Sequence, residues 1–212
     1  MKISWMGHSC FLLEGDGGVK IITDPYESGS YKGQMGYRPV AIDADVVTVS
    51  HEHLDHNYTK GIKTNVIIRD VGVVKVKDIR VEGISSYHDN QQGFLRGRSI
   101  IFIINFEGLK IIHFGDLGTV NINTNMLKDA DVVFIPVGGV FTLGADQAKE
   151  IIKKINPKIT VPMHFKTEKI GFNIERVDKF LQSEDYEERN NLLLDSNSVN
   201  SFKRIVVLKY KR

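Results

Sequence analysis

The stretch Ser50-His51-Glu52-His53-Leu54-Asp55-His56 holds three of the seven histidines of this 212-residue chain, with an aspartate among them. The apolar β-forming run at positions 46–49 leads directly into it and predicts a buried strand that ends at the histidines. Alternate side chains of an extended loop point the same way, so His51 and His53 are expected to bind one ion together. The spacing therefore predicts a metal site at the end of this strand.

Asp55 and the adjacent His56 can turn toward a second ion in the same loop. Imidazole and carboxylate ligands suit zinc, manganese or iron rather than calcium. The letters His51-Glu52 also begin the zinc-protease motif H-E-x-x-H, but position 55 is Asp and the preceding strand argues against a helix. The alternative is a polar loop that happens to contain histidine. Three histidines and an aspartate so close together favour the metal site.

Length and composition predict a single globular domain over residues 1–212. Hydrophobic residues make up 42% and charged residues 25% of the chain, and the net charge is +2, too small to predict binding to nucleic acid or an anionic membrane. The one cysteine, Cys10, excludes an intrachain disulfide and is expected to serve packing. No signal-like or membrane-spanning apolar run is present, so we expect a cytoplasmic protein.

Short strands dominate the pattern of the chain, and helices alternate with them toward the C-terminus. Strands are expected at 2–5, 10–14, 19–23, 46–49, 65–69, 73–76, 79–84, 99–106, 109–114, 131–137, 159–162 and 205–210. Helices are expected at 126–127, 144–155 and 174–181, and a loop or helix extension at 183–191. This periodicity predicts a mixed α/β or α+β class with helices packed outside sheets.

The glycine- and tyrosine-rich segment 26–39 has no clear period and predicts a long loop. Loops of this length often form lids or substrate walls, and a plain excursion is an equal alternative.

Further residues of metal-ligand type follow three other predicted strands. His88, Asp116 and His164 each stand at or just beyond a strand end. Strand ends of one sheet are neighbours in space, so these side chains are expected to join the His51 loop in one cluster. Asp89, beside His88, competes with it for the same role.

Six segments together carry a resemblance to a known family, in family order between residues 3 and 167. They are Trp5-Met6-Gly7-His8-Ser9, Ile22-Thr23-Asp24-Pro25, His51-Glu52-His53-Leu54-Asp55-His56, His113-Phe114-Gly115-Asp116, Ile135-Pro136-Val137-Gly138-Gly139 and Val161-Pro162-Met163-His164-Phe165. In these segments the chain resembles the metallo-β-lactamase fold superfamily. Within it, the likeness is to the short branch of ascorbate-6-phosphate lactonase-like proteins and predicted metal-dependent hydrolases.

The resemblance implies an α+β fold, a four-layer αβ/βα sandwich with two mixed sheets face to face and the site at one edge. It also implies two divalent metal ions, zinc first, with manganese or iron as alternatives. The first ion would be held by His51, His53 and His88, the second by Asp55, His56 and His164, with Asp116 bridging both. Asp55 and Asp116 are the residues named as catalytic.

Three further residues do not match ligand positions of the family and are expected to lie close behind the ligands: His8, Asp24 and His113. A ligating imidazole usually donates its other N–H to a carboxylate or carbonyl, and Asp24 suits that task. Capping of the turn before Pro25 is an equal alternative for Asp24.

The implied activity is that of a binuclear hydrolase. Two ions that share a water lower its pKa from ~15.7 toward ~7, and the bridging hydroxide attacks an ester, lactone or phosphoester of a small molecule. The alternatives are a nuclease or phosphodiesterase acting on RNA or a cyclic nucleotide, a diiron redox enzyme, and a non-catalytic metal-binding module.

The expected partner is a small-molecule substrate, without nucleic acid or membrane. The turn at 138–144 precedes a helix and could offer backbone N–H groups to an anionic substrate, although a simple tight connection is the favoured alternative. The exposed final strand with Tyr210 leaves a homo-oligomer open.

Overall fold

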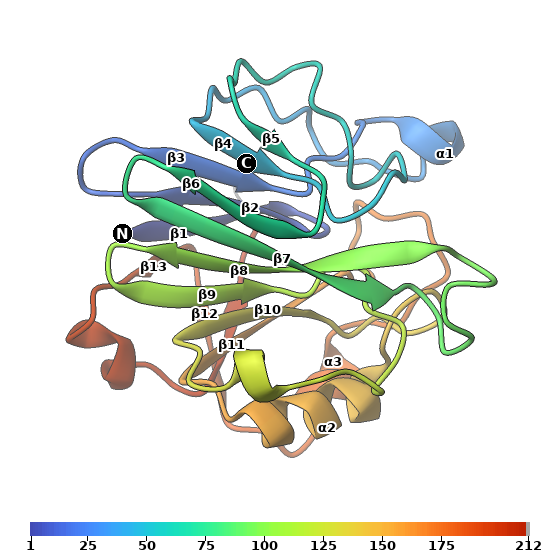
Figure 1. Cartoon of the computed structure of the whole chain (residues 1–212). Coiled ribbons are helices and arrows are strands. Elements are labelled where there is room, and N and C mark those ends of the chain that lie inside the picture. Colours follow the sequence, from blue (N-terminus) through green and yellow to red (C-terminus); the bar gives the residue numbers. More distant parts are fainter. Residues whose placement is uncertain (211–212) are drawn as a thin grey trace.

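Two mixed β-sheets pack face to face in the computed structural model, which describes residues 1–210 (Figure 1). The strand order is β13-β1-β2-β3-β4-β5 in the first sheet and β12-β14-β11-β10-β9-β8-β7-β6 in the second. The first sheet comprises β1 (Lys2–Gly7), β2 (Cys10–Glu14), β3 (Lys20–Thr23), β4 (Val46–Thr48), β5 (Ile67–Ile68) and β13 (Leu192–Leu193). The second comprises β6 (Gly72–Val76), β7 (Ile79–Tyr87), β8 (Arg98–Phe106), β9 (Leu109–His113), β10 (Val132–Pro136), β11 (Ile159–Met163), β12 (Tyr186–Arg189) and β14 (Ile205–Leu208). The expected α+β sandwich of two mixed sheets is confirmed.

Helices are few, and the longest of them lies outside the second sheet. Figure 1 shows α2 (Ala145–Ile155) and α3 (Asp178–Leu181) on the face of that sheet turned away from the first sheet. The remaining helical elements are short turns: α1 (Ser30–Gly33), η1 (Asn125–Leu127) and η2 (Ser198–Ser201). Within residues 1–210, no helix has both the length and the apolar character needed to cross a membrane.

Two segments near the C-terminus differ from the sequence prediction. The helix expected over 174–181 is reduced to α3, because the backbone of Glu175 is held in hydrogen bonds to Lys166 and Gly138. The polar run 183–191 contains β12, which pairs in parallel with β14. An edge strand keeps polar side chains in solvent and therefore lacks the apolar pattern that would reveal it.

The core between the sheets is dense and aromatic. Phe11 of β2 and Phe134 of β10 stack with ring centroids 3.9 Å apart and planes at 9°, and both side chains are fully buried. Such packing joins the two sheets directly and holds their strand ends at fixed separations.

The strands that precede the predicted site residues all point the same way. β1 and β3 are both antiparallel to β2, and β4 runs parallel to β3. In the second sheet β7 and β9 are both antiparallel to β8, and β10 and β11 follow β9 in parallel. The carboxyl ends of these strands therefore open at one edge of the sandwich, which is where sites of open sheets form.

Candidate metal centre

The first cluster of ligand atoms consists of His51, His53 and His88. Their ring nitrogens lie within 4.8 Å of one another, and His51 Nε2 is 3.0 Å from His53 Nδ1. His51 and His88 are buried, whereas His53 is more exposed. The structure thus brings together the three residues that the resemblance assigned to the first ion.

The second cluster contains Asp55, His56 and His164, with His8 added to them. Their ligand atoms also lie within 4.8 Å of one another, and all four residues are buried. His8 Nε2 donates a hydrogen bond to Asp55 Oδ2 at 3.1 Å. His8 is thus close enough to belong to the cluster, and its hydrogen bond to Asp55 is also one that a residue supporting a ligand would make.

Asp116 joins the two clusters through a single oxygen. Its Oδ2 is 3.2 Å from His88 Nε2 and 3.8 Å from His51 Nε2, both of the first cluster. The same oxygen is 3.2 Å from His56 Nε2 and 3.3 Å from His164 Nε2 in the second. This is the position that a bridging carboxylate requires.

Asp24 determines the tautomer of His51 and His56 through hydrogen bonds to their Nδ1 sides. The carboxylate accepts hydrogen bonds from Ser50 N–H at 2.8 Å, Ser50 Oγ–H at 2.5 Å and His56 Nδ1–H at 2.9 Å. Ser50 Oγ, having given its only hydrogen to Asp24, accepts from His51 Nδ1–H at 3.0 Å. The Nε2 lone pairs of His51 and His56 are therefore left facing Asp116.

His88 is fixed in the same tautomer by a different acceptor. Its Nδ1–H donates to the Phe141 carbonyl at 3.1 Å, so its Nε2 also faces the carboxylate. The carbonyl is presented by a turn in which Val140 has a φ of 61°, a left-handed conformation that is rare for a β-branched residue. Such strained backbone is found where a site demands it.

Asp89 does not compete with His88 for the metal site. Its two oxygens accept four backbone N–H groups at 2.8 to 3.0 Å, from Gln91, Gly93, Leu95 and Arg96. Burial alone would raise the pKa of Asp89, but these four donors lower it below its usual value. The residue organises the loop that follows His88 instead.

His113 lies outside both clusters and supports the strand ends. Its Nε2–H donates to the Ser9 carbonyl at 2.8 Å, and its Nδ1 accepts Gly115 N–H at 3.1 Å. Burial lowers its pKa, so the ring stays neutral, as an accepting Nδ1 requires. The supporting position expected for His113 matches these contacts.

The electrostatics of the cluster call for a cation among the ligand atoms. Imidazole lone pairs and carboxylate oxygens at these distances repel one another unless a proton or metal ion lies between them. Burial alone would lower the pKa of His56, but the Asp116 and Asp55 carboxylates raise it well above its usual value. Four buried atoms of these residues have no hydrogen-bond partner among residues 1–210: His8 Nδ1, His56 Nε2, Asp116 Oδ1 and His164 Nδ1. Imidazole and carboxylate donors in this arrangement fit two divalent transition-metal ions.

Without metal, the protein is expected to be most stable near pH 6.5, which is the ordinary pKa of a histidine side chain. Burial lowers the pKa of His8 to about 4 and of His51 to about 3. Below pH 6.5 these histidines are therefore protonated in the unfolded chain but not in the folded protein, and stability falls as pH falls. Despite burial, the Asp116 carboxylate raises the pKa of His56 and of His88. Both rings are therefore protonated in the folded protein at pH 6.5, and stability falls as rising pH passes their raised pKa and removes these protons.

The measurement is the thermal midpoint of chelator-treated protein between about pH 5 and about pH 9. A midpoint that keeps rising above pH 6.5 would contradict the raised pKa of His56. Added metal is expected to displace these protons and to flatten the alkaline side of the profile.

A cavity of about 500 Å³ opens over the two clusters. Tyr31, Phe141 and Phe172 form an aromatic wall, with ring centroids 5.3 Å apart for Tyr31–Phe172 and 6.3 Å for Phe141–Phe172. Tyr31 Oη–H also donates to Asp55 Oδ1 at 3.0 Å. Gln34 lines the same cavity, so the segment 26–39 contributes part of the cavity wall.

A second hollow of about 630 Å³ lies on the other side of His53. It shares His53 and Arg96 with the first cavity and also contains Arg69 and Arg98. Arg69 is paired with Glu52 at 2.6 Å. His53 and Arg96 therefore stand between the two hollows.

The turn at 138–144 uses its backbone N–H groups internally. Gly139, Phe141, Thr142, Leu143 and Gly144 all donate within the turn, to the Leu117 carbonyl or to the Gln147 side chain. These five N–H groups are not available to an anion, and the tight-connection alternative describes the segment. Gly138 is required there, since a Cβ would stand 2.1 Å from the His164 carbonyl oxygen.

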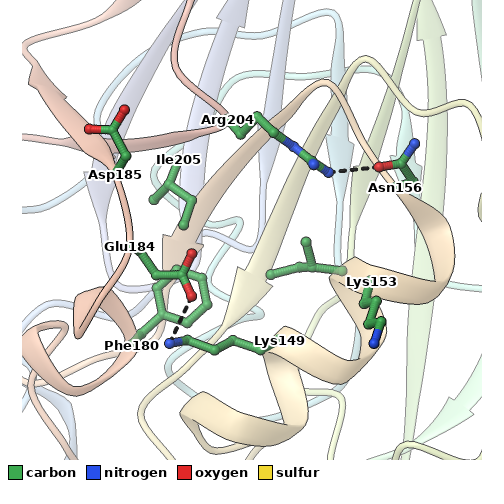
Figure 2. A pocket seen from close by; sticks show the side chains of 9 residues that line it. Lys149, Lys153, Asn156, Phe180, Glu184, Asp185, Arg204 and Ile205 are labelled. Atoms are coloured by element: carbon green, nitrogen blue, oxygen red, sulfur yellow. Dashed lines mark hydrogen bonds and ion pairs between the residues drawn. The ribbon is translucent and has the colours of Figure 1, made fainter.

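A further hollow, of about 440 Å³, lies between α2, α3 and the start of β14 (Figure 2). Figure 2 shows Lys149 paired with Glu184 at 2.9 Å and Arg204 bonded to Asn156 at 2.7 Å. None of the predicted site residues lines it, and two of its cations already have partners.

The comparisons with known proteins agree with this geometry. Residues 2–164 match the family described as the β-lactamase superfamily domain. The chain belongs to the metallo-β-lactamase superfamily. It is 32% identical to a UPF0173 protein of Pyrococcus furiosus over 79% of this chain and 84% of that one. It is 27% identical to a UPF0173 metal-dependent hydrolase of Thermococcus kodakarensis, over 79% and 85% of the two chains.

A solved structure extends the superfamily likeness across the whole fold. A Thermotoga maritima protein of the metallo-β-lactamase superfamily shares 34% identity and superposes with a TM-score of 0.79 over 98% of this chain and 97% of that one. Both the sequence order of the motifs and the arrangement of the two sheets are thus superfamily features of this chain.

Sequence reasoning missed several residues that the structure places at the site. Ser50 relays the hydrogen bond from His51 to Asp24, and Arg96 and Phe172 line the cavity. Ser50 stands next to His51 in the sequence, and that adjacency was the only available hint. Arg96 and Phe172 lie in irregular segments whose course no periodicity predicts.

Proposed function

We propose that this protein is a binuclear metal-dependent hydrolase that cleaves an ester, lactone or phosphoester bond of a small molecule. The observation that carries the proposal is the single Asp116 oxygen facing Nε2 atoms of both histidine clusters. Relatives named metal-dependent hydrolases support it. Zinc is the first candidate metal, with manganese or iron as alternatives.

The candidate ligands would form two metal sites. His51, His53 and His88 would hold one, Asp55, His56 and His164 the other, and Asp116 would contact both. Bound there, the ions would supply Lewis acidity that lowers the pKa of a water and polarises the bond to be cleaved. Asp24 accepts the Nδ1 proton of His56 directly and that of His51 through Ser50, so Nε2 is the atom of each ring that would bind metal once any proton on it is displaced.

The chain itself provides the remaining parts of the site. Tyr31 Oη–H holds Asp55 Oδ1, which orients that carboxylate toward His56. Phe141 and Phe172 cover one side of the cavity and exclude water from the reacting groups. Burial makes the free thiolate of Cys10 unfavourable by raising its pKa well above the usual value, so we assign that side chain no part in the chemistry.

The test is metal content by elemental mass spectrometry on protein purified without chelator, combined with hydrolysis of bis-4-nitrophenyl phosphate, a lactone panel and 4-nitrophenyl esters. We expect about two equivalents of metal and turnover that chelator removes and metal restores. One equivalent would contradict the binuclear site. No metal, with none taken up on addition, would contradict the proposal as a whole.

A further inference from the structure

Arg96 is a cation without a counter-charge at the rim of the metal centre. It is half-buried and lines both the aromatic cavity and the hollow beyond His53. Among residues 1–210 no carboxylate forms an ion pair with its guanidinium. A half-buried arginine without an acidic partner has N–H donors that can bind an acceptor in the adjoining cavity.

The loop that carries Arg96 is firmly held. The backbone N–H of Arg96 donates to Asp89 Oδ2 at 2.8 Å, and His88 N–H closes the loop on the Gly97 carbonyl at 3.1 Å. The loop is thus tied to the residues that start it, one of which belongs to the first metal cluster. Such bracing fixes the distance between the Arg96 backbone and the metal centre.

The side chain is fixed by an aromatic contact. The guanidinium carbon lies 5.8 Å from the centroid of the Phe141 ring, within cation–π range. The carbonyl of the same Phe141 holds His88. Among residues 1–210 the guanidinium N–H groups donate no hydrogen bond, so they are available to an acceptor such as a carboxylate or phosphate.

We propose that Arg96 binds an anionic group of the substrate, distinct from the bond that is cleaved, so that the enzyme selects anionic esters over neutral ones. The apolar part of such a substrate would lie against Tyr31, Phe141 and Phe172, and its carboxylate or phosphate would meet the Arg96 fork. This inference rests on the proposed hydrolase for its substrate class. The binding of the anion itself does not depend on turnover.

The contrast with the other cations of the surface supports this choice. In the hollow of Figure 2 Lys149 and Arg204 already have partners, and Arg69 beside His53 is neutralised by Glu52. Arg98 in the hollow beyond His53 also has no ion pair among residues 1–210, but it is exposed and does not line the cavity over the two clusters. Arg96 is half-buried and lines that cavity. This combination is typical of a recognition residue rather than of a solvated surface charge.

The binding test uses calorimetric titration of the purified, metal-loaded protein with glutarate and with inorganic phosphate. Arg96→Gln is expected to weaken one or both anions by about 10- to 100-fold, the effect of losing a charged hydrogen-bond donor. The anion that loses affinity identifies the group recognised. Arg80→Gln is the control, since it removes the same charge from the far end of β7, where Arg80 pairs with Glu82.

The kinetic test compares two esters that differ only in their end group. Mono-4-nitrophenyl glutarate ends in a carboxylate, and 4-nitrophenyl pentanoate ends in a methyl group. Arg96→Gln is expected to lower kcat/KM for the first ester by about 10-fold or more relative to its effect on the second, chiefly through KM. Arg96→Lys, which keeps the charge and loses the planar fork, is expected to recover part of the affinity.

The outcomes separate this inference from the proposed function. Anion binding that weakens in Arg96→Gln but not in Arg80→Gln supports the anion site, even if no ester is hydrolysed. Equal weakening in both variants, unchanged binding in Arg96→Gln, or no binding by the native protein overturns it. Thermal midpoints of all variants show whether each protein is folded when it is measured.

Discussion

Asp116→Asn is expected to lower turnover by more than about 100-fold and to reduce bound metal below two equivalents. Loss of a partner that only orients a ligand already costs about 10- to 100-fold, and Asp116 contacts histidines of both clusters directly. The amide keeps the size of the side chain but removes its charge and one acceptor oxygen. The measurement is kcat/KM together with elemental metal content.

The matched control for this variant is Asp131→Asn. Asp131 is also buried, accepts Lys110 N–H at 2.7 Å and pairs with Lys158 at 2.8 Å, but it precedes β10, whereas the metal clusters follow the strands. The control is expected to lose stability while keeping its metal and its turnover per folded molecule. Full activity in Asp116→Asn would contradict the bridging role.

Asp24→Asn is expected to weaken metal binding by about 10- to 100-fold without touching any ligand. The asparagine NH₂ group can donate but not accept, and the buried Nδ1–H of His56 needs an acceptor. Where the NH₂ group faces His56, the ring must move its proton to Nε2, the atom that faces Asp116. A proton on that atom blocks the metal position.

The measurement is competitive titration of the apoprotein with a chromophoric zinc chelator, with Asp131→Asn again as the control. A stability loss of about 1–3 kcal/mol is expected as well, because Ser50 and His56 share the same buried carboxylate. Unchanged zinc affinity would show that His56 keeps Nε2 free without help from Asp24. Reduced affinity with unchanged thermal midpoint would separate the tautomer effect from general loosening.

The sequence predicted that these histidines and aspartates gather at one edge of the fold, because they stand at the ends of apolar strands. Strand runs such as 46–49 are local features that the side chains themselves reveal. The H-x-H spacing in an extended loop is also local, and His51 and His53 lie together as expected. The order of motifs then indicated the superfamily, which the match over residues 2–164 confirmed.

The prediction was weaker wherever a residue's role depends on a partner distant in the chain. His8 was expected close to the ligands, but its contact with Asp55, 47 residues away, depends on the pairing of β2 with β3 and of β3 with β4. The helix expected over 174–181 forms only at 178–181, because Glu175 N–H donates to the Gly138 carbonyl and the Glu175 carbonyl accepts Lys166 N–H, which outweighs the local helical pattern.

By itself, the sequence determined which side chains could bind metal and which segments form strands, because backbone preference and apolar periodicity act between near neighbours. The tertiary structure decided which nitrogen of each imidazole faces Asp116, since that depends on acceptors such as Asp24 and the Phe141 carbonyl. It also placed Arg96 on the cavity over the two histidine clusters, with no ion pair among residues 1–210. Hydrogen-bond direction and charge pairing are fixed only when segments far apart in the chain pack together.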